Sequence, residues 1–299
     1  MSEDFIIALF CSIDDFCAKF EPMFNKTFLP NHRKTTRKTR LCLSELMTIV
    51  VIFHISKFRT FKDFYSSEIL RGYFPALSYT RFVSLMPRTV FPLFCYLSSL
   101  LERPTGLSFI DSTILTVCHI HRASSHKTFK EIASKSKTST GWFFGLKLHL
   151  VINEGGQLQA FHLTTGSTHD LIPVESLTKK LFGYLFGDKA YLSKNLFQKL
   201  YQRGLKLITR IRSNMKNVLM DPWEKVMLRA RGIIESVNNR LKNGCQIEHH
   251  RHRSPRNFLA NLFGGLAAYQ LQPNKPSLHF SSVEKLQLSH MIIQNSRYF

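Results

Sequence analysis

The sequence predicts an α/β protein in which an all-α N-terminal region precedes a mixed five-stranded sheet flanked by helices. In roughly the first hundred residues, apolar side chains recur at helical spacing between proline and basic connectors. From Gly106 onwards, strands and helices alternate in the order β-β-β-α-β-α-β-α. We therefore expect a helical N-terminal region at residues 1–104, a sheet domain at 105–272 and a C-terminal tail at 273–299.

Caps and aromatic spacing predict the N-terminal helices. Ser44 can cap a helix whose apolar positions continue through Phe53. The aromatic residues between 58 and 65 also recur at helical spacing, which is more typical of a core than of a recognition surface.

A run of basic residues from His32 to Arg40 separates the first two helices. A solvated linker and an arm that follows DNA phosphates explain this run equally well. In the second interpretation the DNA-binding residues are Arg33, Lys34, Arg37 and Lys38.

Three antiparallel strands are predicted at the start of the sheet. The first is an apolar run at 107–110 that ends at Asp111, with residues 114–118 prolonging it. A basic, Ser/Thr-rich stretch at 122–140 reads as a flexible loop. Residues 143–152 alternate with a period of two, and 157–163 return as their hairpin partner.

A short strand at 184–187 delivers a second acid, Asp188. It lies between helices expected at about 171–181 and 193–204, and a last strand follows at 205–211. The first and fourth strands of such a mixed sheet can be neighbours. Asp111 and Asp188 would then meet although they are distant in sequence.

A third acid, Glu235, lies in a helix with clear boundary signals. Asp221-Pro222-Trp223-Glu224 is a strong N-terminus, and the helix should stop at Gly244. Arg231 and Lys242 are expected on the same helix face as Glu235. Taken alone, an Arg/Glu pair of this kind is usually a surface salt bridge.

Charge indicates the partner of the protein. The formal net charge is +21 and the pI about 9.9, so the expected partner is a polyanion, with nucleic acid first. The longest apolar stretch, Met47–Ile55, is too short to span a membrane, and no secretory signal begins the chain. We expect a cytoplasmic, nucleoid-associated protein whose six scattered cysteines stay reduced.

Five motifs in order resemble the DDE transposases of bacterial insertion sequences, most closely the group numbered nine-eight-two. The resemblance is close over about Phe109–Tyr269. Its motifs are Phe109-Ile110-Asp111-Ser112, Val117-Cys118 with Arg122, the segment Gly141-Trp142-Phe143-Phe144-Gly145-Leu146-Lys147-Leu148-His149, Gly187-Asp188-Lys189-Ala190-Tyr191, and Arg231-x-x-x-Glu235-x6-Lys242.

The resemblance implies an RNase H-like catalytic domain in which Asp111, Asp188 and Glu235 are the catalytic residues and hold two divalent ions, magnesium or manganese. Such ions, about 3.5–4 Å apart, stabilise the attacking and leaving oxygens of a phosphodiester. The implied activity is endonucleolytic cleavage at the element ends followed by strand transfer into target DNA. The implied partners are double-stranded DNA, as terminal repeats and target, and a second subunit in a homodimeric synaptic complex.

Several basic residues are candidates for binding DNA around this site. The resemblance implies this role for Arg231 and Lys242. Lys147, His149 and Lys189 can equally hold phosphates or be ordinary surface charge. One departure from the family is Leu228, which stands where a tyrosine is often found.

Two further histidine motifs have alternative explanations. His169-Asp170 can cap the next helix or support the acids from a neighbouring position. The run His249–Arg253 suits phosphate contacts better than zinc, because its arginines would repel a cation.

Two alternatives to an active transposase remain at the level of sequence. One is a non-catalytic DNA-binding remnant of a transposase, which the three intact acids disfavour. The other is an RNase H-like nuclease, which has no need of an N-terminal region that recognises element ends.

Overall fold

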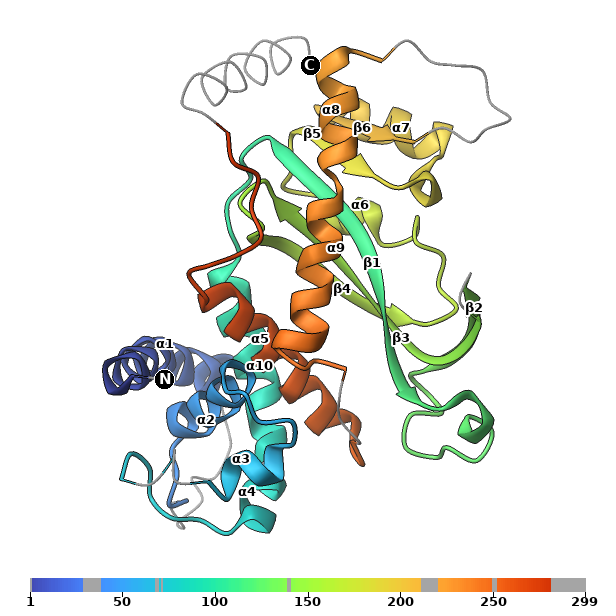
Figure 1. Cartoon of the computed structure of the whole chain (residues 1–299). Coiled ribbons are helices and arrows are strands. Elements are labelled where there is room, and N and C mark those ends of the chain that lie inside the picture. Colours follow the sequence, from blue (N-terminus) through green and yellow to red (C-terminus); the bar gives the residue numbers. More distant parts are fainter. Residues whose placement is uncertain are drawn as a thin grey trace. The chain divides into compact units, whose positions relative to one another are not determined.

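Two units make up the chain in the computed structural model, which describes residues 2–28, 39–67, 70, 72–138, 141–210, 220–248 and 252–280. The first, here called the helical unit, comprises Met1–Leu100 and Leu241–Gln272. The second, here called the sheet unit, comprises Leu101–Arg240 and Pro273–Phe299. Figure 1 shows the elements of each unit in the colours of the sequence.

The helical unit confirms the helical character expected of the N-terminal region. Its helices are α1 (Glu3–Phe28), α2 (Leu43–Ile55), α3 (Phe61–Tyr65), α4 (Tyr79–Leu85), α5 (Val90–Leu100) and α10 (Pro255–Leu271), with a 3-10 turn, η2, at Met86–Thr89. Helix α2 begins slightly earlier than Ser44 would cap it. The Glu45 carboxylate accepts the backbone N–H of Cys42, and the Ser44 hydroxyl instead donates to Asp14 of α1.

Helix α10 belongs to the helical unit, whereas the sequence assigned residues 241–272 to the sheet domain. The reason is close packing against α2. A Cβ atom added at Gly264 would collide with Val50, and one at Gly265 would collide with Ile247. The ring of His54 on α2 bonds through Nδ1 to the carbonyl of Cys245 and ties the two segments together. The first boundary lies between Leu100 and Leu101, close to the expected one.

The sheet unit has the mixed α/β architecture that the sequence predicts. Its strands are β1 (Leu107–Cys118), β2 (Ser134–Thr138), β3 (Gly141–Asn153), β4 (Leu158–Thr165), β5 (Gly183–Gly187) and β6 (Leu205–Thr209). The order is β2-β3-β1-β5-β6, with β4 paired to β3. Strands β1, β3 and β4 are antiparallel, and β5 and β6 are parallel additions, as expected.

Strand β2 is the one addition to the predicted set. It lies in the stretch that the sequence assigned to a flexible loop, and it pairs with the start of β3. Its side chains alternate between half-buried and exposed positions. Such a polar edge strand carries no apolar periodicity, which explains why the sequence did not reveal it.

Helices flank the sheet: α6 (Val174–Leu177), α7 (Lys194–Tyr201), α8 (Pro222–Ala230) and α9 (Gly232–Asn239). The predicted cap residues Ser193 and Asp221 both accept backbone N–H groups at their helix starts. The single helix expected up to Asn243 breaks at Arg231, and a π-helical turn follows at Arg240–Gly244. No helix in the described part of the chain is long and apolar enough to cross a membrane.

Candidate catalytic site

The two aspartates lie on neighbouring parallel strands. Strand β1 pairs with β5 in a register that sets Leu107 opposite Tyr184 and Phe109 opposite Phe186. Two residues further along, the same register sets Asp111 opposite Asp188. Because side chains alternate along a strand, both acids share the sheet face that carries Tyr184 and Phe186.

Asp111 lies inside its strand, because the prolongation over residues 114–118 that the sequence allowed is present. Strand β1 continues to Cys118 because β3 remains paired with it on the other edge, with Leu150 opposite Asp111. Only β5 ends here, so Asp188 follows its last residue. There its Oδ1 accepts the backbone N–H of Lys189 at 2.6 Å and caps a short 3-10 turn.

Helices α8 and α9 cover this same face. The Trp223 ring of α8 packs edge-on against Tyr184 and Phe186, with centroid distances of 4.9 and 5.9 Å. Glu224 of α8 pairs with Lys206 of β6, which fixes the other side of the helix. Figure 1 shows α8 and α9 following one another along the sheet, and α9 contacts β1. The third acid is therefore delivered to the face that holds the two aspartates.

Arg231 joins the acids at the break between α8 and α9. Its Nη2 lies 2.6 Å from Glu235 Oε1, and its Nη1 lies 4.0 Å from Asp111 Oδ1. Only 8% of Arg231 is exposed, whereas the Glu235 side chain is 62% exposed. The Asn238 amide, one turn further along α9, donates to Asp111 Oδ2 at 3.0 Å. The sequence motifs did not single out Asn238 as a partner of the acids.

The carboxylates influence one another electrostatically. Burial raises the pKa of Asp111 to about 6, Arg231 acts in the opposite direction, and the negative charges of Glu235 and Asp188 raise that pKa further. Like charges held together in this way disfavour full ionisation unless a cation compensates them.

A divalent metal fits the chemistry of this donor set. Hard cations such as magnesium prefer carboxylate and amide oxygens. Besides the three acids, Asn238 Oδ1 is buried without a hydrogen-bond partner among the described residues. No group of three His, Cys, Asp or Glu side chains in the described part is placed to hold a metal. Glu235 is instead turned to Arg231, and its exposure leaves it room to rotate.

Asp170 forms a second cluster next to the site. Its Oδ1 accepts from Ser112 Oγ at 3.0 Å and from Lys147 Nζ at 3.1 Å. Lys147 also donates to the carbonyl of Thr168 at 3.0 Å. Ser112 follows Asp111 directly, so Asp170 supports β1 from the opposite face of the sheet. Asp170 thus contacts the residue that follows Asp111, which fits a supporting position beside the acids. His169 acts separately, because its ring accepts the N–H of Leu171.

The predicted DNA-binding residues have different surroundings. His149 is a correction: it is fully buried against Thr164, and burial lowers its pKa to about 4, so it presents no charge to DNA. Its alternating strand pattern suggested an exposed face, but β3 is covered on both faces. Lys147 is mostly buried and engaged with Asp170, whereas Lys189 is exposed beside Asp188.

Lys242 lies in the π-helical turn and pairs with Glu248 at 2.9 Å. The 3.6-residue spacing that placed it on the face of Glu235 does not continue through such a turn. Arg33, Lys34, Arg37 and Lys38 lie outside the described residues, as do His249, His250 and Arg251.

Comparisons with known proteins identify a family and a shared fold. Residues 101–255 match the family model described as "Transposase DDE domain". The chain is similar to the cryo-EM structure of a piggyBac transposase synaptic complex with hairpin DNA, with a TM-score of 0.51. That match covers 98% of this chain and 81% of the other at 11% sequence identity, and it shows a shared fold. No curated protein matches the sequence.

Proposed function

This chain belongs to the transposase DDE domain family, and on that premise we propose that it is an active DNA transposase of an insertion sequence. The observation that carries the proposal is the register between β1 and β5, which sets Asp111 beside Asp188 under the helix that bears Glu235. An inactive DNA-binding remnant has no physical requirement for three acids to converge.

Asp111, Asp188 and Glu235 would hold the metal ions. Two bound divalent ions would supply activation of the attacking oxygen and stabilisation of the leaving one. Glu235 reaches that position by exchanging its partner: its exposed carboxylate leaves Arg231 and turns towards the aspartates. Asn238 keeps Asp111 oriented during this change through its 3.0 Å hydrogen bond.

Arg231 then becomes available to the substrate. Its guanidinium remains beside Asp111, and it can form charge-assisted hydrogen bonds with a phosphate. Lys189, exposed next to Asp188, is suited to a neighbouring phosphate of the same strand. In this proposal the acidic side chains bind the metal ions, and the basic side chains beside them bind phosphates of the DNA backbone.

The reaction we propose has two steps on DNA. Water attacks the phosphodiester at the element end and releases a 3′-hydroxyl. That hydroxyl attacks a phosphodiester of the target DNA, so one P–O bond forms as another breaks and no external energy source is needed. Two element ends must be joined to one target, and a homodimer bound to double-stranded DNA satisfies this requirement.

Cleavage of a labelled element end by the purified full chain tests the proposal. The wild type should cleave with magnesium. Asp188→Asn should cleave more than about 100-fold more slowly, a larger loss than is typical for residues that only contact a metal ligand. Glu175→Gln is the matched control, because Glu175 forms an exposed ion pair with Lys199. Equal cleavage by wild type and Asp188→Asn, or by neither, would sink the assignment.

The choice of DNA separates a transposase from a general nuclease. Cleavage should depend on the inverted repeats that flank the gene. Equal cleavage of a scrambled duplex would support the nuclease alternative instead.

A further inference from the structure

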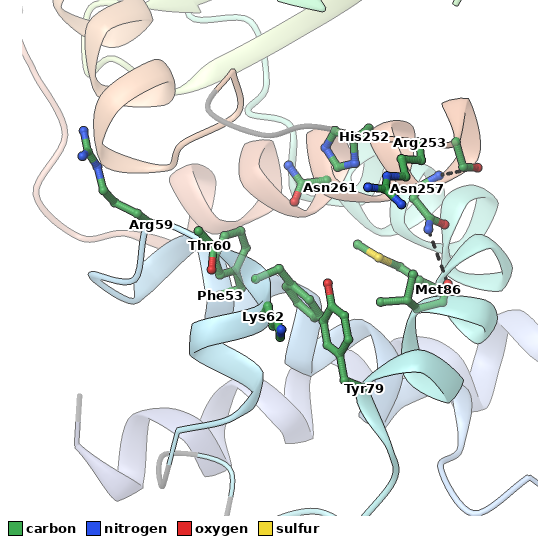
Figure 2. Close-up of a pocket in the computed structure, with 13 residues that line it drawn as sticks. Phe53, Arg59, Thr60, Lys62, Tyr79, Met86, His252, Arg253, Asn257 and Asn261 are labelled. Atoms are coloured by element: carbon green, nitrogen blue, oxygen red, sulfur yellow. Dashed lines mark hydrogen bonds between the residues drawn. The ribbon is translucent and has the colours of Figure 1, made fainter. Parts of the chain in front are cut away.

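A pocket in the helical unit lies outside the acid cluster and has no role in the chemistry described so far. Its volume is about 820 Å³, within the range of roughly 300–1,000 Å³ typical of small-ligand sites. Figure 2 shows side chains from α2, α3 and α4 on its walls together with residues at the start of α10. All of its lining residues belong to the helical unit: Phe53, Arg59, Thr60, Phe61, Lys62, Tyr79, Val83, Met86, His252, Arg253, Ser254, Asn257 and Asn261.

Apolar and aromatic side chains form much of the pocket wall. The rings of Phe61 and Tyr79 are half-buried, so part of each remains accessible, whereas Phe53 and Met86 are buried. The two accessible rings lie near each other, with centroids 6.4 Å apart. Such a surface suits a flat, weakly polar group rather than a phosphate alone.

The charge at the pocket is positive. Three exposed cations contribute to its lining, Arg59, Lys62 and Arg253, and none forms an ion pair with a described residue. The lining contains no carboxylate. The nearest acid in sequence, Asp63, accepts from the Thr60 hydroxyl at 2.6 Å. Helix α10 adds the partial positive charge of its N-terminus, which Ser254 caps.

The side-chain oxygen of Asn257 at the pocket lacks a partner among the described residues. The Asn257 amide donates through Nδ2 to the carbonyl of Val83, as Figure 2 shows, but its Oδ1 accepts nothing within the described chain. A buried acceptor of this kind costs free energy unless a ligand supplies a donor. The pocket therefore combines a flat apolar wall, an available hydrogen-bond acceptor and a cationic rim.

Resting on the proposed DNA chemistry, we propose that this pocket binds one unpaired base of a DNA strand. The base lies against Phe61 and Tyr79, its exocyclic amino or ring N–H donates to Asn257 Oδ1, and the adjoining phosphates bind the three cations. A base with its adjoining phosphates matches all three chemical features of the pocket, whereas a phosphate alone leaves its apolar wall unused.

Binding to two oligonucleotides of equal charge tests this proposal without any cleavage. We would measure fluorescence anisotropy in EDTA with a twelve-residue oligothymidylate and with an abasic strand of the same length. Wild type should bind the strand with bases at least about fivefold more tightly, the lower end of the range for base–aromatic stacking. Tyr79→Ala should remove this preference and Tyr79→Phe should keep it.

Charge and volume variants complete the design. Arg253→Ala should weaken binding of both strands equally, whereas Lys19→Ala, which removes an exposed charge from α1 away from the pocket, should change neither by more than about twofold. Val83→Phe fills the pocket without removing an aromatic ring, so it should also abolish the preference even if Tyr79→Ala folds poorly.

The result that overturns the proposal is a preference for bases that survives in both Tyr79→Ala and Val83→Phe. If the wild type does not cleave DNA, but its preference for bases is lost in Tyr79→Ala and Val83→Phe, the pocket assignment stands and the transposase assignment fails. If the wild type cleaves DNA, but both pocket variants keep the preference for bases, the transposase assignment stands and the pocket assignment fails.

Discussion

The two units of the chain use ionic side chains in different ways. In the sheet unit, charged groups are partly buried and engaged with one another, as Arg231 is with Glu235 and Lys147 with Asp170. At the pocket of the helical unit, three cations lie exposed without ion pairs among the described residues. Buried paired charge fixes geometry at a cost in desolvation, and exposed charge attracts a polyanion. The difference matches the roles that we propose, catalysis at the acids and recognition at the pocket.

Asp111→Asn should give the largest effect and the clearest separation of the two regions. Cleavage should fall more than about 100-fold, beyond the losses typical of outer partners of metal ligands. The melting temperature should stay the same or rise in metal-free buffer, because burial already raises the pKa of this carboxyl to about 6. Cleavage assays and thermal unfolding would measure the two effects. A parallel loss of both would indicate a structural role.

Asp170→Asn should reduce cleavage by about 10- to 100-fold, the usual effect of disturbing a group that orients a metal ligand. The variant weakens the contact with Lys147 while it leaves the three acids in place. The variant should also differ from the wild type in the magnesium concentration needed for half-maximal cleavage rate. An unchanged magnesium dependence would show that Asp170 stabilises β1 without influencing the site.

His54→Leu should affect stability rather than chemistry. Removing the ring leaves the buried carbonyl of Cys245 without this partner, which costs about 1–3 kcal/mol. Urea unfolding would measure the loss, with His162→Leu on an exposed position of β4 as the control. An equal loss in both variants would contradict a specific role for the contact.

Mild acid should weaken the helical unit more than the sheet unit. Burial lowers the pKa of His54 and of His252 to about 4, so both remain neutral when folded but bind protons when unfolded below pH of about 6.5. Stability from these residues falls as the pH drops from about 6.5 to 4.

In the sheet unit, two pKa shifts have opposite effects on stability as the pH falls. His149 behaves like the two other histidines, whereas the raised pKa of Asp111 makes its folded form gain stability as the pH falls through about 6. Hydrogen exchange of each unit in metal-free buffer at pH 7 and pH 5, corrected for intrinsic rates, would measure the difference. Equal weakening of both units would contradict it.

The sequence predicted the parts of this fold that local patterns encode. The parallel pairing of β1 with β5 follows from strand order, and the helix starts at Ser193 and Asp221 follow from capping chemistry. Strand order allowed β1 and β5 to be neighbours, and the structure pairs them in the register that sets Asp111 beside Asp188.

The features that the sequence missed depend on tertiary contacts. The burial of His149 requires both faces of β3 to be covered, and the role of Asp170 requires β1 and the segment after β4 to meet. The break at Arg231 interrupts an amphipathic pattern that continues without a signal. Helix α10 follows the sheet domain in sequence, but its glycines fit only against the helical unit.

The place of α10 has a consequence for the synthesis of the protein. The ribosome releases the first hundred residues before residues 101–240 of the sheet unit, and α10 only after them. During that interval the almost wholly apolar helix α2 lacks the partner that covers Val50 and His54. Nascent chains commonly fold from the N-terminus as they emerge. Here the helical unit is completed only after residues 101–240 have emerged, so the pocket that we propose for an unpaired base forms only in a chain that already carries Asp111, Asp188 and Glu235.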